Sequence, residues 1–311
     1  MTLDPQMAAL LEKLRLLPKL ERMSPQEVRA TTAALGAGAP PGPALHEVVD
    51  RRIDTPDGPL ALRIYRPSER SAGLIVYYHA GGWVTGSLDS PDAALRDFAL
   101  RTGCCIVSVD YRLAPEHPFP AAVLDARYAL EWADAARAEF TGHDAALLVA
   151  GESAGGTLAA VVSILARDRG GPRIAGQLLF YPVTAADFST PSYIECADGY
   201  FLSRDLMRWF WNHYAPDERQ RRDFRASPLL AEDLSRLPPA LIQTAEYDPL
   251  RDEGETYGRR LEAAGVPAVV QRRAGLIHGY VGMAPAVAAA RQAVDEAAAW
   301  VKTAAGISRV G

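Results

Sequence analysis

Short apolar runs alternate with helical stretches along most of the chain, and this alternation is the feature that most restricts its fold. The apolar runs lie at residues 74–78, 106–109, 146–150, 177–181 and 240–245, with a further strand at 268–271. The main helical stretches between them lie at residues 121–139, 155–167 and 252–264. Strands that are apolar throughout are buried on both faces, and helical crossovers join parallel strands. The pattern therefore predicts an α/β fold with a mostly parallel sheet and helices on both faces.

Two helical segments interrupt or precede this pattern. Residues 1–44 are predicted to form two helices, the second starting with a capping box at Ser24, followed by a proline-rich linker. Residues 185–225 are rich in aromatic and charged side chains and are predicted to be a helical insertion that could cover a pocket. Ser203 is the predicted N-cap of a helix whose apolar face collects Leu206, Met207, Phe210, Trp211 and Tyr214.

The core domain is then predicted to comprise residues 45–184 and 226–311. It should begin with a β-hairpin, because two strand-like runs at residues 46–53 and 60–65 flank a Pro-Asp-Gly turn.

Composition narrows the range of partners and locations. The 311 residues are 49% hydrophobic and 23% charged, which is ordinary for a globular protein. The net charge is −5 and no dense block of Lys and Arg occurs, so we expect neither nucleic acid binding nor stable membrane association. Asp4 and Glu12 stand where a signal peptide would carry basic and then apolar residues, which predicts a cytoplasmic protein. The 3 cysteines have no zinc-site spacing, so we expect buried free thiols and no metal.

The sequence Gly151-Glu152-Ser153-Ala154-Gly155-Gly156 is the sharpest chemical signal. It matches G-x-S-x-G, follows an apolar strand and opens a helix of small residues, which is the setting of a nucleophile elbow. Glycines at 151 and 155 would remove side-chain collisions in such a tight turn. We therefore predict that Ser153 is a nucleophile at a helix N-terminus; the alternative is a glycine-rich turn with an idle serine.

A serine nucleophile needs a base and a group that orients the base. His278 follows the strand at 268–271, and histidine comes last in the order serine, acid, histidine. His213, the other histidine after Ser153, lies in the helical insertion. Asp248 ends the strand at 240–245 and is the predicted acid.

Two neighbouring carboxylates are rivals for the role of the acid. These are Glu246 and Asp252, and Asp252 is expected to cap the following helix instead.

Acyl transfer also needs hydrogen-bond donors for the oxyanion. His79-Ala80-Gly81-Gly82-Trp83 follows the strand at 74–78, and its glycines would let main-chain N–H groups approach an oxygen closely. The predicted donors are the N–H groups of Gly81, Gly82 and Ala154, with His79 organising the loop. Predicted pocket walls, each of which could equally be ordinary core, are Trp83, Phe201, Leu202, Met207, Phe210 and Leu276.

Five motifs together resemble those of the hormone-sensitive-lipase-like esterases, also called bacterial esterase family IV, over about residues 45 to 300. They are the loop at 79–83, the long signature at 110–122, the elbow at 151–156, the acid motif at 248–254 and the histidine motif at 278–280. Three positions depart from the family pattern: Ala80 replaces a glycine, Glu152 an aspartate and Tyr280 a phenylalanine. None of these changes removes a catalytic group.

The resemblance implies an eight-stranded α/β-hydrolase sheet and a cap built from segments 1–44 and 185–225. It also implies a cofactor-independent carboxylesterase acting on small-molecule esters with short-to-medium acyl groups, and a possible homodimer through the sheet edge. An amidase, a lactonase or a specialised deacetylase could use the same triad. A non-catalytic ligand receptor on this fold is a further alternative.

Overall fold

The computed structural model describes residues 2–37 and 41–307. Residues 38–40, within the predicted proline-rich linker, lie outside the described part. The sheet consists of β1 (Glu47–Thr55), β2 (Gly58–Arg66), β3 (Ser71–Tyr78), β4 (Cys105–Val109), β5 (Thr141–Glu152), β6 (Gly176–Phe180), β7 (Ala240–Tyr247) and β8 (Ala268–Ile277). Each predicted apolar run therefore corresponds to a strand, although β5 and β8 are longer than predicted.

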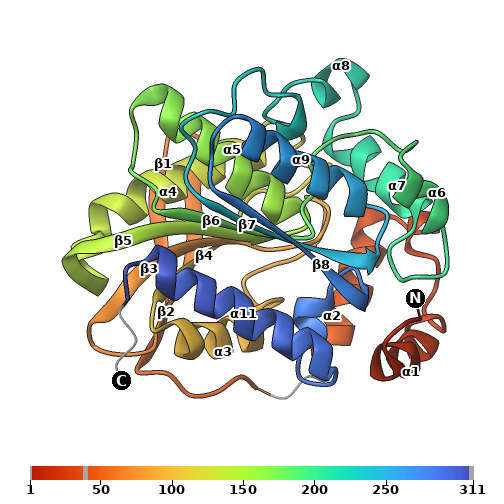
Figure 1. Cartoon of the computed structure of the whole chain (residues 1–311), viewed down its shortest axis with the longest axis horizontal. Helices are drawn as coiled ribbons and strands as arrows, with labels where there is room; N and C mark the ends of the chain where they lie inside the picture. The colour runs from red at the N-terminus through yellow and green to blue at the C-terminus, as the bar shows by residue number, and fades with distance from the viewer. Residues whose placement is uncertain (1, 38–40, 308–311) are drawn as a thin grey trace.

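The eight strands form one sheet in the order β1-β2-β4-β3-β5-β6-β7-β8 (Figure 1). β1 and β2 form the predicted antiparallel hairpin, and β2 also pairs antiparallel with β4. The remaining neighbours, from β4 through β3 and β5 to β8, pair in parallel. The predicted mostly parallel, eight-stranded sheet is confirmed, and its parallel strands present their carboxyl ends at one edge.

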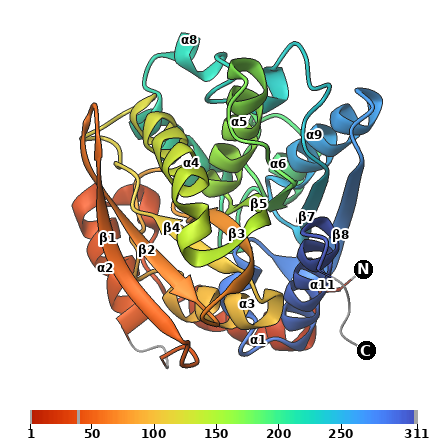
Figure 2. The same cartoon turned by 90° about the vertical axis from the view of Figure 1, so that its left-hand side faces the viewer.

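Helices cover both faces of the sheet, as predicted (Figures 1 and 2). One layer contains α4 (Ala121–Phe140), α5 (Ala154–Arg169) and α9 (Arg251–Ala263). The other contains α3 (Asp92–Thr102), α10 (Tyr280–Met283) and α11 (Ala288–Ala304). The buried apolar side chains form two clusters, one under each layer. α5 is buried along residues 154–166, which explains why this helix consists of small and aliphatic residues.

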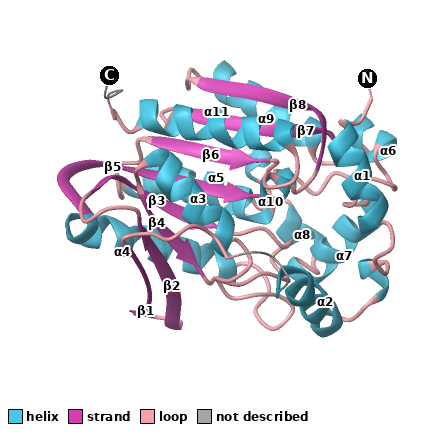
Figure 3. Ribbon diagram, turned by 90° about the horizontal axis from the view of Figure 1, so that it is seen from below, coloured by secondary structure: helices cyan, strands magenta, loops and turns pink. Residues whose placement is uncertain are grey.

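The N-terminal and inserted segments lie together at one end of the sheet (Figure 3). The first contains α1 (Pro5–Leu14), the 3₁₀ helix η1 (Leu20–Arg22) and α2 (Pro25–Ala37). The second contains α6 (Pro191–Glu195), α7 (Arg204–Tyr214) and α8 (Glu218–Arg221), and the 3₁₀ helix η2 (Pro228–Leu230) follows. Lys19 pairs with Asp198 at 3.0 Å, and Arg15 donates to the Gly199 carbonyl at 3.3 Å. These contacts join the two segments directly.

The predicted caps of α2 and α7 are present. Ser24 and Glu27 form the reciprocal capping box of α2, since each accepts the other's backbone N–H. Ser203 caps α7 by accepting the Leu206 N–H at 3.0 Å, and the five bulky residues predicted to share a face of this helix are its buried residues. Within the described ranges, no helix combines the length and apolarity needed to cross a bilayer.

Candidate active site

Ser153 lies in the sharp turn between β5 and α5. Its φ is +54°, which is rare for a residue with a side chain, and its N–H donates to the Phe180 carbonyl at 2.9 Å. A Cβ on Gly151 would lie 2.2 Å from the Gly155 carbonyl oxygen, and a Cβ on Gly155 would lie 1.9 Å from the Tyr78 carbonyl oxygen. Only glycine fits at either position, so the two motif glycines are what lets the chain turn sharply at Ser153.

Ser153, His278 and Asp248 form one continuous chain of hydrogen bonds. His278 Nε2 lies 3.0 Å from Ser153 Oγ, and His278 Nδ1 lies 2.7 Å from Asp248 Oδ2. All three residues are buried. An ionised carboxylate only accepts hydrogen bonds, so Nδ1 carries the proton and Nε2 is free to accept the serine hydroxyl. The arrangement can therefore move a proton from Ser153 to His278.

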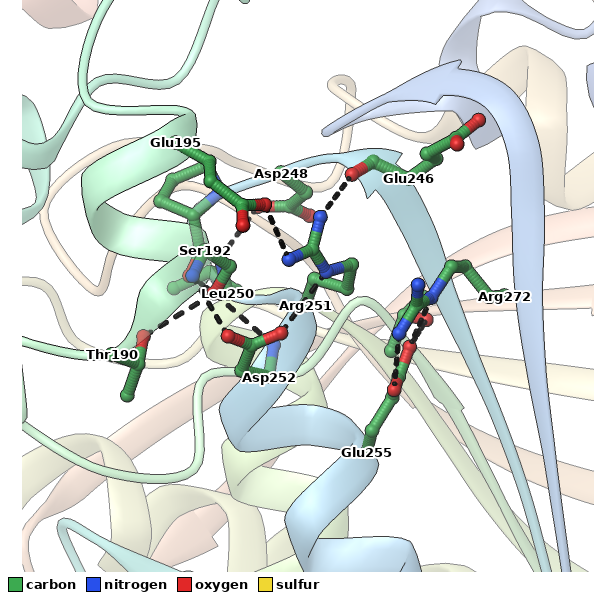
Figure 4. Close-up of polar contacts among 12 residues, drawn as sticks. Thr190, Ser192, Glu195, Glu246, Asp248, Leu250, Arg251, Asp252, Glu255 and Arg272 are labelled. Carbon is green, nitrogen blue, oxygen red and sulfur yellow. Dashed lines mark hydrogen bonds and ion pairs between the residues drawn. The ribbon is translucent and has the colours of Figure 1, made fainter. Parts of the chain in front are cut away.

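The hydrogen-bond partners of the carboxylates near the end of β7 distinguish Asp248 from its two rivals (Figure 4). Asp248 Oδ1 accepts the Leu250 N–H at 2.9 Å, which aims the second oxygen at His278. Glu246 instead accepts the Gly275 N–H at 2.7 Å. Asp252 accepts the Ser192 N–H at 2.7 Å. Of the three carboxylates, Asp248 is the one that contacts the histidine.

The expectation that Asp252 caps the following helix is wrong. α9 begins at Arg251 with Leu250 as its N-cap, and no side chain caps it. Asp252 lies in the first turn, where it binds Arg251 and the N-terminal end of α6 (Figure 4). Ser192 of α6 also donates to the Pro249 carbonyl at 2.6 Å, so the inserted segment holds the loop that carries Asp248.

The predicted oxyanion donors lie in two turns, one after β3 and one at the start of α5. Gly81 and Gly82 have φ values of +123° and +59°, and a Cβ on Gly81 would lie 2.1 Å from the Thr85 carbonyl oxygen. The Ala154 N–H belongs to the first turn of α5, where helical N–H groups have no partner within the helix. In the part of the chain that the structure describes, these three N–H groups have no protein acceptor. They are therefore available to a bound oxygen.

Comparison with known proteins assigns the chain to a family whose fold agrees with the one described above. The family model of the α/β hydrolase fold matches residues 75–282. The chain belongs to this family.

Similar proteins include several that are named esterases. Esterase LipI of Mycobacterium tuberculosis is 46% identical over 254 residues, which cover 80% of this chain and 79% of that protein. Carboxylesterase NlhH of the same organism is 44% identical over 250 residues, covering 79% and 78%. The crystal structure of a thermostable esterase from Pseudomonas putida superposes with a TM-score of 0.92 at 37% identity, covering 99% of both chains. The resemblance to hormone-sensitive-lipase-like esterases is confirmed.

His79 shapes the oxyanion loop of the hydrolase. Its ring stacks on Tyr111 with centroids 4.2 Å apart, and its Nδ1 lies 2.7 Å from the Ala80 carbonyl oxygen. A carbonyl oxygen only accepts, so Nδ1 carries the proton. Burial lowers the pKa of His79 to about 4, so its ring is neutral near pH 7. Gly86 leaves room for the ring, since a Cβ there would lie 2.4 Å from Nδ1.

Arg29 of α2 is a site residue that no sequence motif marks. Its guanidinium donates to the Val84 carbonyl at 2.7 Å and to the Ala114 carbonyl at 2.8 Å. It also forms a two-pronged ion pair with Glu116, which lowers the pKa of that carboxyl to about 2. Arg29 thus fixes the segment that follows the oxyanion glycines, across separations of 55 to 87 positions in sequence.

The predicted pocket walls occupy different places in the hydrolase. Phe210 lies against Gly82, because a Cβ on Gly82 would be 2.2 Å from the Phe210 ring. Phe201 is 43% exposed, lies beside Gly279 and lines a cavity of about 290 Å³ between the N-terminal and inserted segments. The other four are buried, and their role as pocket walls stays a prediction: Trp83, Leu202, Met207 and Leu276.

Two expectations concern metal chemistry and cysteines. Among the described residues, no group of three or more His, Cys, Asp or Glu side chains could hold a metal ion. The predicted buried free thiols are present at Cys104, Cys105 and Cys196.

We expect Gly155→Ala to destabilise the hydrolase by about 1–3 kcal/mol or more, because the new methyl group meets the fixed backbone of Tyr78. Thermal unfolding followed by circular dichroism measures the effect. Gly142→Ala is the matched control, since a Cβ there has nothing within 4 Å. Equal midpoints for the two variants would contradict the steric account of the turn.

Proposed function

We propose that the protein is a serine carboxylesterase that forms an acyl-enzyme on Ser153. The observation that carries the proposal is the hydrogen-bonded chain from Ser153 through His278 to Asp248. The esterase relatives, at up to 46% identity among those named above, support the class of reaction.

The first half of the proposed reaction acylates the serine. Ser153 Oγ attacks the ester carbonyl carbon while His278 Nε2 takes the hydroxyl proton. The carbonyl oxygen becomes an oxyanion that accepts the N–H groups of Gly81, Gly82 and Ala154. Asp248 holds the imidazole in the productive tautomer and stabilises its positive charge.

The second half releases the products. The tetrahedral intermediate collapses, the bond to the alcohol oxygen breaks, and His278 donates its proton to the departing alcohol. Water then attacks the acyl-enzyme carbonyl as His278 takes a proton from it, and the carboxylic acid leaves as the proton returns to Ser153 Oγ. Each step uses side chains and N–H groups of this chain.

The substrate is proposed to be a small ester with a short-to-medium acyl group. Segments 1–44 and 185–225 are proposed as the cap, and Phe210 of the inserted segment bounds the space beside the donor Gly82. An amidase, a lactonase or a specialised deacetylase on the same triad would differ in the leaving group that it accepts and in the shape of its pocket. The cytoplasmic location and the homodimer stay predictions.

Ser153→Ala should reduce turnover of p-nitrophenyl butyrate by about 10⁴-fold or more, because the acyl-enzyme can no longer form. Ser163→Ala is the matched control, because this serine is buried in α5, the helix that follows Ser153, and its hydroxyl donates to the Ala159 carbonyl. Steady-state kinetics measures both variants, and turnover by Ser153→Ala near the wild-type rate would refute the proposal. A fluorophosphonate probe should label the wild-type protein, whereas a non-catalytic receptor would stay unlabelled.

Asp248→Asn should lower kcat by up to about 10⁴-fold, since the amide cannot hold the imidazole in the productive tautomer. Asp252→Asn should stay within about 10-fold of wild type, because this carboxylate binds α6 and Arg251 rather than His278. Comparing kcat of the two variants separates the acid from its neighbour. A larger loss in Asp252→Asn would reverse the assignment.

An acyl series of p-nitrophenyl esters, from acetate to dodecanoate, should show kcat/KM highest for the short chains. Phe210→Ala should raise kcat/KM for the dodecanoate ester relative to the butyrate ester by about 10-fold. The reason is that the ring against Gly82 would no longer limit the depth of the proposed acyl pocket. Trp209→Ala removes the neighbouring, partly buried indole and should leave the ratio unchanged. An unchanged ratio in Phe210→Ala would place the acyl group elsewhere.

A further inference from the structure

Glu152, the last residue of β5, is a buried carboxylate immediately before the nucleophile. Its two oxygens accept hydrogen bonds from two phenols: Tyr77 of β3 binds Oε1, and Tyr181 binds Oε2 at 2.5 Å. Among the described residues, no arginine or lysine forms an ion pair with it. A carboxylate without a cation in the core is costly, and such positions are retained where they serve chemistry.

The two phenols favour the ionised form of Glu152. A phenol O–H donates to each oxygen, and hydrogen bonds donated to a carboxyl group stabilise its charged form. Burial raises the pKa of Glu152, and the bonds from Tyr181 and Tyr77 oppose that rise. Interaction with the charge on His278 opposes it as well. The carboxylate and the histidine are therefore electrostatically coupled.

Tyr181 links this carboxylate to the histidine. Its ring lies against the His278 ring with centroids 4.7 Å apart, and it meets the ring of Tyr280 edge-on at 5.0 Å. The backbone of Tyr181 has φ +36°, an unusual value for an aromatic residue, and its N–H donates to the Gln243 carbonyl at 2.6 Å. The hydroxyl of Tyr280 also binds Gln243. The Tyr181 side chain thus contacts His278, Tyr280 and Glu152, and it extends from a backbone conformation that costs strain.

We propose that Glu152, acting through Tyr181, is a second carboxylate for His278: its buried charge stabilises the imidazolium and the Tyr181 ring fixes the imidazole plane. Glu152 is a positioning residue, and the proposal rests on the serine esterase mechanism above. Asp248 binds Nδ1 directly and sets the tautomer. Glu152 makes no hydrogen bond to the imidazole, so its contribution is charge at short range in a medium of low dielectric constant.

The ionisable groups around this pair come from several elements. His278 faces Ser153 from the turn after β5, Asp248 from the end of β7 and Tyr181 from the end of β6. Glu152 faces Tyr77 and Tyr181 directly, and it also raises the pKa values of Tyr111 and Tyr280. The phenols are neutral near pH 7, since burial raises their pKa values further. Glu152 and Asp248 are then the two negative charges that act on the imidazole.

Glu152→Gln is the central test, because it removes the charge and keeps the size of the side chain. Losing a nearby negative charge makes the imidazolium less stable, so the acid limb of the kcat/KM profile should move to lower pH by about half to one unit. At the pH optimum kcat should fall about 10-fold with KM within about 2-fold, since the loss appears when the imidazolium forms. Glu152→Asp keeps the charge and should restore the acid limb to its wild-type position.

Tyr77→Phe tests the same charge through the phenol on β3, which has no ring contact with His278 among the described residues. It removes one of the two donors to Glu152 and leaves the Tyr181 ring on the imidazole, so Glu152 should become protonated at a higher pH. Its kcat should therefore approach the wild-type value as the pH rises and the Glu152→Gln value as the pH falls. This variant decides the question even if Glu152→Gln folds poorly, which thermal unfolding would reveal.

The outcomes separate this proposal from the esterase mechanism itself. Wild-type kcat and an unshifted acid limb in Glu152→Gln would overturn the role of Glu152, provided that Ser153→Ala is inactive in the same assay. A lower kcat with an unshifted acid limb in Glu152→Gln would also overturn the role of Glu152, because lost packing alone would explain that result. Activity in Ser153→Ala would instead overturn the mechanism on which the proposal rests.

Discussion

The turn at Ser153 is the constraint on which the rest of the site depends. The nucleophile has a positive φ, and the turn closes only because residues 151 and 155 carry no Cβ. This geometry places the hydroxyl at the carboxyl edge of the sheet, where the ends of β7 and β8 bring Asp248 and His278. It also packs the start of α5 against the end of β3, where Gly155 meets the carbonyl groups of Tyr78 and His79. One strained residue thus brings the nucleophile within reach of its base.

Local sequence predicted those features that local chemistry determines. The apolar runs identified the five strands β3 to β7, because strands buried on both faces are largely apolar. The hairpin of β1 and β2 was predicted from its turn, and β8 from its short apolar start. Two strands were predicted too short where polar residues enter them. β8 continues through Arg272 and Arg273, because their charges form ion pairs with Glu255 and Glu296 and so do not end the strand. The elbow, the acid and the histidine were predictable because each is marked by glycine, proline or chain order.

Contacts between distant segments were not predictable. Asp252 looked like a helix cap because it stands near the start of α9, but α6 supplies its partner from 60 positions away. The same limit applies to Tyr181, which meets Glu152 and His278 only once β6 lies beside β5. It also applies to Arg29, whose acceptors near the predicted oxyanion loop are the main-chain carbonyls of Val84 and Ala114. A main-chain acceptor leaves no mark in the sequence, since every residue type provides one.

The ties of the N-terminal segment have a consequence for how substrates enter and leave. Arg29 binds the main chain just beyond the oxyanion glycines, while Arg15 and Lys19 bind the inserted segment at Gly199 and Asp198. The same short stretch of chain therefore binds both the inserted segment and the chain that follows Gly81 and Gly82. If these segments act as the proposed cap, an outward movement of that stretch breaks both sets of contacts together, and the loop of Gly81 and Gly82 loses its support whenever the route to Ser153 widens.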